Sequence, residues 1–404
     1  MNIWIIQTGE PMFTDGPNVR PMRAMNLASK AVEAGHEVTV ITANFDHFTK
    51  VKRFQSDNVV NIEKSLSVFF IDSPGYKRNI SPQRFIDHLI LGYRMSKFCN
   101  KLPMPDSVFI GYPPIETSWF MSKFLKKRNI PYILDVKDAW PTNIVEAFPK
   151  KLRPLAQFFL FPYFLMFQFS ARNAFKLCSI SESFLHWSQN IGKRENIAQD
   201  FIAPLTSREI QIQPNDLLIA EEWFSERVKL EKDKKTIYFI GSLSRSFDFD
   251  PVMKLAKENK INLIIGGDGE QYEYLHNQTA GLKNVFLLGW VNYAQGQVIS
   301  MNSDLALAPL KPLPDFEMSV PNKYYDYMRQ GKPILSSLSG DSKKLIEDNE
   351  IGFYYSSYED LRHIIENINS KTQNIYEENA KEIYEQKFSY EIVYSNLLKN
   401  LLDS

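Results

Sequence analysis

Apolar runs of strand length alternate with helical patterns along the whole chain. In the first half these runs are Ile3–Gln7, Val38–Thr42, Ser67–Ile71, Val108–Ile110, Tyr132–Leu134 and Leu177–Ser179. In the second half they are Ile237–Ile240, Ile261–Ile265, Val285–Leu288, Leu305–Ala308 and Ile334–Ser336. Short β-rich runs separated by helices indicate parallel strands joined by right-handed crossovers. The pattern therefore predicts an α/β protein with doubly wound sheets.

A polar segment divides the two sets of strands. It includes the highly charged stretch EEWFSERVKLEKDKK, and we expect residues 206–235 to form a linker with an exposed helix. We predict one Rossmann-like domain over 1–205 and a second over 236–385, with a C-terminal helix in 386–404 that packs back towards the first. Ligands of such sheets bind beyond the carboxyl ends of the strands, so two domains facing each other would share a central cleft.

Composition excludes some classes of function. The chain has 404 residues, with 47 Lys+Arg and 47 Asp+Glu, so its formal net charge is zero. This balance argues against a nucleic-acid binder held by bulk positive charge, and we expect no nucleic-acid partner. The two cysteines, Cys99 and Cys178, fit no disulfide or metal framework, and the start MNIWIIQTGE lacks the features of a signal peptide. We therefore expect a cytoplasmic protein.

One stretch, 155–169 (LAQFFLFPYFLMFQF), is nearly all apolar, and basic residues flank it on both sides. It is shorter than the roughly 20 apolar residues of a membrane span and contains Pro162. Two interpretations remain open. The segment is a buried core helix, or it lies in the headgroup layer, with 150–176 in contact with the inner face of the cytoplasmic membrane.

Loops of the first half carry candidate ligand contacts. Gly16 lies in a Gly/Pro-rich loop after the first strand, and Arg20 follows it, either as a phosphate ligand with Arg23 or as a solvated helix charge. Asp138 follows the strand YIL and is either an acceptor-binding carboxylate or a helix cap. Trp140 offers a face for sugar stacking, and Tyr112, after the strand VFI, is expected on the same rim.

Loops of the second half favour a nucleotide. Gly241 and Gly267 end two strands, where a flat backbone allows close approach, and Arg245 follows in a loop where its guanidinium can meet a diphosphate. Trp290 and Val291 follow the strand VFLLG and are expected to line a base pocket. The D-x-D sequence at 248–250 is better explained by a helix cap than by a metal site.

The segment PNKYYDYMRQGKP at 321–333 is the most specific. Its proline and glycine fit the start and stop of a helix, so Asn322 and Lys323 would present amides and an ammonium to an anion. Asp326 lies about one turn further on the same face, where a carboxylate suits vicinal hydroxyls. The constellation indicates a nucleoside diphosphate, and the alternative is an ordinary capped helix with a surface Lys–Asp pair.

Several signatures of other chemistry are missing from the sequence. The six histidines show no metal-ligand spacing, and no G-x-S-x-G elbow, catalytic-cysteine signature or Walker loop occurs. Covalent catalysis and ATP hydrolysis are therefore disfavoured.

Taken together, AVEAGHEVTVIT, DVKDAWP, GSL, IGGDGE, NVFLLGWV and PNKYYDYMRQGKPIL run in order over nearly the whole chain. In this order they resemble retaining family-4 glycosyltransferases of the GT-B fold. The resemblance is closest to the bacterial branch that builds O-antigen, capsule and similar polysaccharides.

The resemblance implies a nucleotide-sugar donor, by default a UDP-sugar, in the second domain. It implies a glycan or polyprenyl-diphosphate-linked acceptor in the first. Arg245 and Lys323 match the family's diphosphate contacts, and Asp326 matches the acidic residue that binds the donor ribose. Gly16 falls in the glycine loop near the donor phosphates, and Asp138 in the acceptor-side loop.

The chain departs from the family where two glutamates are expected, because Met318 and Asp326 occupy their positions. Glu317 or Asp315 is expected to substitute for the first of these carboxylates in the donor site. The resemblance implies a retaining, metal-independent glycosyl transfer, so we expect no metal and no cofactor. The departures motivate one rival, a catalytically idle GT-B subunit that binds and activates a partner glycosyltransferase.

Overall fold

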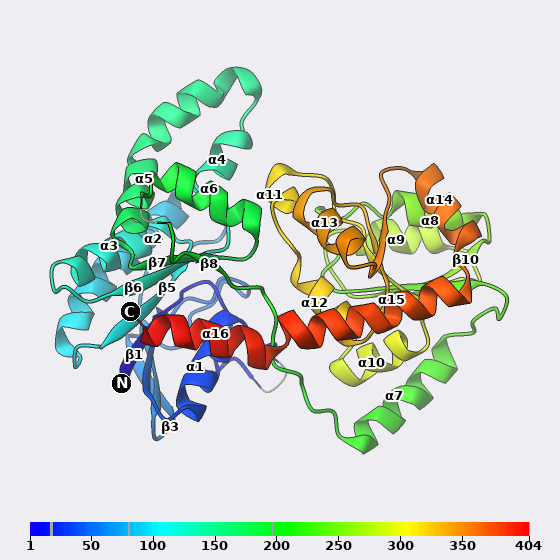
Figure 1. Ribbon diagram of the computed structural model, residues 1–404, viewed down its shortest axis with the longest axis horizontal. Coiled ribbons are helices and arrows are strands. Elements are labelled where there is room, and N and C mark those ends of the chain that lie inside the picture. Colours follow the sequence, from blue (N-terminus) through cyan, green and yellow to red (C-terminus); the bar gives the residue numbers. More distant parts are fainter. Residues whose placement is uncertain (17–18, 80, 196, 404) are drawn as a thin grey trace. The chain divides into compact units, whose positions relative to one another are not determined.

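The computed structural model describes residues 1–404 except 17–18, 80, 196 and 404. The chain divides into two compact units, drawn in Figure 1. Unit 1 comprises Met1–Arg208 with Tyr390–Ser404, and unit 2 comprises Glu209–Ser389. The chain thus enters unit 2 and returns to unit 1 for its last segment.

Unit 1 is built on an eight-stranded sheet in the order β3-β4-β2-β1-β5-β6-β7-β8. Its strands are β1 (Asn2–Ile6), β2 (Glu37–Ala43), β3 (Asn58–Glu63), β4 (Leu66–Ile71), β5 (Ser107–Tyr112), β6 (Tyr132–Val136), β7 (Lys176–Ser179) and β8 (Phe201–Ile202). All pairs are parallel except β3 with β4. This edge hairpin was not predicted, because β3 alternates half-buried and exposed positions without an apolar run.

Helices cover both faces of this sheet. They are α1 (Arg23–Glu33), α2 (Pro82–Phe98), α3 (Ile115–Lys126), α4 (Thr142–Glu146), α5 (Arg153–Asn173), α6 (Glu182–Gly192) and α16 (Tyr390–Leu402), with 3-10 turns at Cys99–Lys101 and Lys150–Leu152. Along β1, Ile3 and Ile5 belong to one buried cluster and Trp4 to the other. Alternate side chains of a strand point to opposite faces, so the continuous apolar run reflects burial on both sides.

Unit 2 is built on a six-stranded parallel sheet in the order β11-β10-β9-β12-β13-β14. Its strands are β9 (Lys235–Ile240), β10 (Ile261–Gly266), β11 (Val285–Gly289), β12 (Leu305–Ala308), β13 (Ile334–Ser336) and β14 (Gly352–Tyr354). Its helices are α7 (Pro214–Arg227), α8 (Asp250–Lys257), α9 (Tyr272–Thr279), α10 (Tyr293–Met301), α11 (Pro314–Glu317), α12 (Asn322–Arg329), α13 (Gly340–Asp348), α14 (Tyr358–Asn367) and α15 (Ser370–Ile383), followed by a π-helical turn at Tyr384–Phe388.

The polar segment between the two sheets differs from the expected linker with an exposed helix. Its helix, α7, packs against α10, and Ala220 and Phe224 on one face of α7 are buried. The charged residues of α7 are exposed, and the rest of the charged stretch, from Lys229 onward, follows the helix. The helix therefore belongs to unit 2.

The apolar segment 155–169 forms most of α5, whose two halves differ. The C-terminal half packs on α3 and α6 and buries Phe167 and Ala171. In Figure 1 the N-terminal half projects beyond the helices that cover the same face of the sheet. There Phe158 is 74% exposed and Phe159 is 68% exposed. No helix among the described residues is long and apolar enough to cross a bilayer.

Candidate functional site

The carboxyl ends of three adjacent strands of unit 2 are joined backbone to backbone. The amide of Gly241, after β9, donates to Gly266 O at 2.9 Å, and the amide of Gly267, after β10, donates to Gly289 O at 2.6 Å. Further along, Leu243 N donates to Asp268 O at 2.8 Å. The loops thus form one continuous backbone surface where the fold class locates ligands.

Glycine is required at this surface for two reasons. Gly241 and Gly267 have φ values of +149° and +143°, which L side chains rarely adopt. A Cβ at Gly267 would lie 1.8 Å from Gly241 O, and one at Gly241 would lie 1.9 Å from Lys323 Nζ. The absence of side chains brings the β9 loop, the β10 loop and the Lys323 amine into contact.

Lys323, in the first turn of α12, reaches this surface from the side of β12. Its Nζ donates to Ile240 O at 2.5 Å and lies 4.6 Å from the centroid of the Phe239 ring. The amine is half-buried beside the glycines at the end of β9. A fixed positive charge on a bare backbone surface is suited to binding a phosphate.

Arg245 lies at the rim of the same loops. Its side chain is 83% exposed, and its Nε lies 3.6 Å from Glu270 Oε2. The loop itself is held by Gln271, whose side-chain amide donates to Ser244 O and, at 3.1 Å, to Phe247 O. The backbone is therefore fixed while the guanidinium remains in solvent.

Val291 and Trp290 follow β11 but differ in position. Val291 packs against Gly266, whose added Cβ would meet the Val291 Cγ2 at 3.1 Å. Trp290 is 68% exposed. Of the two residues expected to line a base pocket, Val291 borders the glycine surface, whereas the Trp290 indole lies largely in solvent.

The carboxylates expected at the donor site have protein partners. Asp326 Oδ1 lies 3.5 Å from Arg329 Nη2 within α12. Glu317, at the end of α11, accepts a hydrogen bond from the Ser339 hydroxyl before α13. Asn322 is the first residue of α12, and Pro321 precedes the helix rather than starting it.

Of three predicted acceptor-side residues in unit 1, Asp138 and Trp140 follow β6, and Tyr112 is the last residue of β5. Asp138 Oδ1 accepts a hydrogen bond from Asn143 Nδ2 at 2.8 Å. The Tyr112 hydroxyl donates to Trp140 O at 2.5 Å. Tyr112 is completely buried against Phe167, so its expected place on the rim is wrong. It supports the Trp140 backbone from the core.

The first loop of unit 1 is anchored by a pair that sequence reasoning missed. Arg53 Nε and Nη2 donate to the two oxygens of Asp15 at 2.7 and 2.6 Å. Gly16 follows with φ of +117° and no atom within 4 Å of an added Cβ. Arg20 lies beyond it and is half-buried. The bidentate pair holds the loop while the Gly16 backbone stays accessible.

Arg23 is neither a phosphate ligand nor a solvated helix charge, contrary to both expectations. It is buried, with Nε 3.3 Å from Asp135 Oδ2 and Nη1 donating to Pro204 O at 3.2 Å. Lys137 extends this network by bonding Glu10 and lying 3.7 Å from Asp135. Glu10 Oε2 in turn accepts from Ala24 N at 2.9 Å, at the start of α1. This buried ionic network fixes the loops after β1 and β6.

The described residues contain no group of three or more His, Cys, Asp or Glu side chains placed to hold a metal ion. The D-x-D sequence at 248–250 is a local turn in which Asp250 N donates to Asp248 Oδ1 at 3.1 Å. Asp250 is the first residue of α8 and Phe249 is its N-cap residue, with no capping hydrogen bond from a side chain, so the predicted cap by Asp250 is wrong.

Residues 234–373 match a family model described as glycosyl transferases group 1. The match lies entirely within unit 2. The match covers the strand ends with Gly241, Gly267 and Lys323. A comparison with curated protein sequences finds no match.

Solved structures similar to this chain share its architecture over its whole length. HepE from Anabaena in complex with UDP is 14% identical, with 100% of each chain covered and a TM-score of 0.65. Sucrose-phosphate synthase from Thermosynechococcus elongatus is 13% identical, with 100% of this chain and 99% of that chain covered and a TM-score of 0.68. WaaG, a glycosyltransferase involved in lipopolysaccharide biosynthesis, is 15% identical, with 100% of each chain covered and a TM-score of 0.63. The predicted GT-B fold is confirmed.

Proposed function

We propose that this protein is a retaining, metal-independent glycosyltransferase. It moves a sugar from a nucleotide-diphosphate sugar, a UDP-sugar, to a glycan or lipid-linked oligosaccharide in bacterial surface polysaccharide synthesis. The observation that carries the proposal is the half-buried Lys323 amine on the bare glycine ends of β9 and β10, within the residues that match the group 1 glycosyl transferase family model. The UDP and UDP-glucose complexes of HepE support the choice of donor.

In this proposal the bond between the anomeric carbon and the β-phosphate oxygen breaks. Lys323, Arg245 and the first amides of α12 stabilise the negative charge that develops on the leaving diphosphate. The acceptor hydroxyl, oriented by Asp138, attacks from the face that the phosphate leaves, and its proton passes to the departing phosphate oxygen. The configuration at the anomeric carbon is retained.

The test measures nucleotide binding and turnover in the same preparations. A thermal-shift panel of UDP, GDP, ADP and CMP identifies the base. A ligand present at 100 times its Kd raises the free energy of unfolding by about 2.7 kcal/mol, so the nucleotide that binds raises the melting temperature. Lys323→Ala and Arg245→Ala should lower kcat by about 10²-fold or more, the usual effect of losing one such donor.

Arg362→Ala is the matched control for Arg245→Ala, because Arg362 is also an exposed arginine of unit 2 in an ion pair, 2.9 Å from Glu366. Its turnover should equal that of the wild type. Wild-type turnover in Lys323→Ala and Arg245→Ala would contradict the proposed role of the diphosphate site.

A second candidate is a catalytically idle GT-B subunit that binds and activates a partner glycosyltransferase. It is favoured by Met318 in place of a carboxylate and by the occupation of Asp326 and Glu317 by protein partners. An idle subunit would neither hydrolyse nor transfer any donor sugar, yet would raise the turnover of a partner enzyme.

We also propose that the projecting half of α5 contacts the inner face of the cytoplasmic membrane. Its exposed aromatic rings would enter the acyl boundary, and Lys150, Lys151 and Arg153 at its N-terminal end would meet anionic headgroups. Such contact would bring a lipid-linked acceptor to the loops after β5 and β6.

Vesicle flotation tests the membrane contact. The double variant Phe158→Ser/Phe159→Ser should lose binding to anionic vesicles at low salt. The matched control is Leu218→Ser/Ile219→Ser on α7, an apolar pair that is 60% and 57% exposed but is followed by Glu221 and Glu222. Equal binding of all three proteins, or no binding by the wild type, would end this part of the proposal.

A further inference from the structure

Positively charged side chains from the loop after β2 and from the start of α2 gather around Tyr76, in the loop after β4 of unit 1. Lys50 Nζ lies 4.8 Å from the centroid of the Tyr76 ring, and the Arg84 guanidinium carbon lies 5.6 Å from it. His47 Nδ1 is 2.5 Å from the Tyr76 hydroxyl. We call these four residues the Tyr76 cluster. No candidate site residue lies among them, so the proposed function leaves the cluster unexplained.

The two cations of the Tyr76 cluster are not neutralised by carboxylates. Lys50 Nζ donates to His47 O and to Asn79 Oδ1, and Arg84 Nη1 donates to Asn79 O at 2.9 Å. Within the part of the chain that the structure describes, neither has a carboxylate oxygen within 4 Å, and the buried Arg84 Nε has no hydrogen-bond partner. Two adjacent positive charges bound to neutral oxygens favour the approach of an anion.

The acidic residues nearest the Tyr76 cluster are engaged elsewhere. Asp46 accepts from Phe48 N at 2.8 Å and from the Thr49 hydroxyl at 2.7 Å. Asp87 is buried and accepts from Gly75 N at 2.6 Å. Burial, with the charges of Lys50, Arg84 and His88, lowers the pKa of His47 to about 4. The positive charge of the cluster is therefore that of Lys50 and Arg84, because His47 is neutral near pH 7.

The backbone holds Lys50 in place at a conformational cost. Lys50 has φ of +61°, a region that favours glycine or asparagine, and its amide donates to Asp46 O at 3.0 Å. A lysine in the left-handed region is retained only where its surroundings fix it. The turn points the ammonium back over Tyr76 instead of into solvent.

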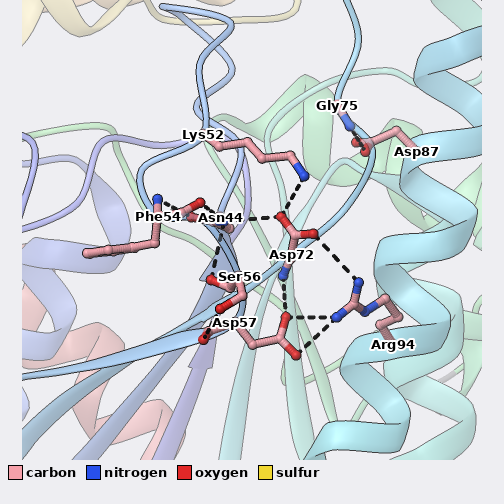
Figure 2. Close-up of polar contacts among 9 residues, drawn as sticks. All are labelled: Asn44, Lys52, Phe54, Ser56, Asp57, Asp72, Gly75, Asp87 and Arg94. Carbon is pink, nitrogen blue, oxygen red and sulfur yellow. Dashed lines mark hydrogen bonds and ion pairs between the residues drawn. The ribbon is translucent and has the colours of Figure 1, made fainter.

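Figure 2 shows how the loops that carry the Tyr76 cluster are tied together. Asp72, after β4, meets Lys52 of the β2 loop at 2.8 Å and Arg94 of α2 at 3.8 Å. Arg94 also binds Asp57 at 3.0 Å, and Asn44 exchanges hydrogen bonds with the Phe54 backbone. The network joins the β2 loop, the β4 loop and α2, the three segments that supply the cluster.

The cluster continues into the predicted acceptor side. The Arg84 guanidinium carbon lies 4.4 Å from the centroid of the Trp140 ring, so Arg84 stacks between Tyr76 and Trp140. Phe85, next in α2, contacts Tyr163 of α5 edge to face at 5.4 Å. Arg84 thus contacts both Tyr76 and Trp140, the tryptophan proposed to bind the acceptor.

We propose that Lys50 and Arg84 of the Tyr76 cluster bind a phosphate or diphosphate group of the acceptor, beside Trp140. The identification of the anion as part of the acceptor rests on the proposed function, whereas the anion site itself is formed by residues of unit 1 alone. Arg84 supplies a planar donor fork, and Lys50 supplies a point charge.

The first test uses inorganic pyrophosphate as the probe, titrated by calorimetry into the full chain at low ionic strength. Saturating UDP is present so that the donor site does not contribute. Lys50→Gln and Arg84→Gln should each weaken pyrophosphate binding at least tenfold, with unchanged thermal melting. In the wild type, bound pyrophosphate should raise the pKa of His47, followed by NMR of ¹³C-labelled histidine, because a nearby anion stabilises the imidazolium.

Lys97→Gln is the matched control, because Lys97 is another lysine over a tyrosine of unit 1, with Nζ 5.6 Å from the centroid of the Tyr93 ring. It should bind pyrophosphate as the wild type does. Equal affinity in Lys50→Gln and Arg84→Gln, or an equal loss in Lys97→Gln, would overturn the proposal.

Competition identifies the source of the phosphate. Farnesyl diphosphate and glucose 1-phosphate are each tested as competitors of pyrophosphate. Displacement by farnesyl diphosphate indicates a lipid-linked phosphate, and displacement by glucose 1-phosphate indicates a sugar-linked phosphate; either result supports an acceptor anion. Displacement by neither contradicts it. Absence of any sugar transfer would overturn the proposed function, yet leave the pyrophosphate result unaffected, so the two failures are distinguishable.

Discussion

At the scale of single residues, Gly267 and Gly281 show that a left-handed glycine has different roles in different surroundings. Both have positive φ, +143° and +81°. An added Cβ at Gly267 would lie 1.8 Å from the Gly241 carbonyl oxygen, whereas at Gly281 it would meet no atom within 4 Å. Only Gly267 is fixed by the backbone of a neighbouring strand end.

Alanine substitution should separate these roles. Gly281→Ala should cost about 1–2 kcal/mol of unfolding free energy through backbone strain alone. Gly267→Ala should cost more than about 3 kcal/mol and abolish the thermal shift with nucleotide, because the clash is with backbone that has no room to shift. Urea denaturation and the nucleotide panel measure both, and similar losses for the two variants would refute this difference.

Residues also limit what could be predicted from the sequence. Arg23 was expected to bind a ligand or to lie in solvent. Its partner Asp135 is far away in the sequence, and the two side chains meet only because β6 lies beside β5, which pairs with β1. Tyr112 is the last residue of a strand, where successive side chains point to opposite faces. A shift of one residue in the register therefore decides whether the Tyr112 side chain lies on the rim or in the core. Roles for Arg245, Lys323 and Asp138 remain predictions.

At the scale of elements, α16 is part of the unit 1 core despite its place after unit 2. Tyr394, Leu397 and Leu401 are buried in the cluster that includes Leu27 and Ala28 of α1. The Tyr394 hydroxyl donates to Thr206 O at 3.1 Å. The helix therefore closes one face of the sheet in unit 1.

Leu397→Ala should therefore destabilise unit 1 by about 2–5 kcal/mol, since truncating a fully buried leucine leaves a cavity. Ile392→Ala is the matched control on the same helix, because Ile392 is 42% exposed, and it should cost about 1 kcal/mol or less. The free energies are measured by urea denaturation. A larger loss in Ile392→Ala would contradict the described packing of α16.

The elements also show where pattern reasoning succeeds. Every predicted apolar run coincides with a strand, because parallel strands covered on both faces are apolar throughout. The missed strands β3, β8 and β14 are an edge hairpin strand and two short edge strands, which lack such runs. Edge position weakens the sequence signal that pattern reasoning uses.

At the scale of the whole molecule, charge and apolar exposure act together. The chain has a formal net charge of zero and a sequence pI of about 7.0, so little electrostatic repulsion separates copies at neutral pH. The exposed phenylalanines of α5 then provide an apolar surface that copies can share.

Solubility should therefore be lowest near pH 7 and rise on either side, measured as the polyethylene glycol concentration at precipitation. Phe158→Ser/Phe159→Ser should raise this concentration at pH 7, whereas Leu218→Ser/Ile219→Ser on α7 should change it less. An unchanged precipitation point in the α5 variant would show that this surface does not drive association.

The place of α16 has a consequence for synthesis of the chain on the ribosome. Unit 1 receives its last core helix only after all of unit 2 has been translated. At about 5–20 residues per second, its apolar α1 face stays open for on the order of ten seconds or more after the other strands and helices of unit 1 have emerged. During that interval unit 1 of the nascent chain is a substrate for chaperones. A premature stop codon within unit 2 would leave the apolar face of α1 permanently exposed, because α16 would never be made.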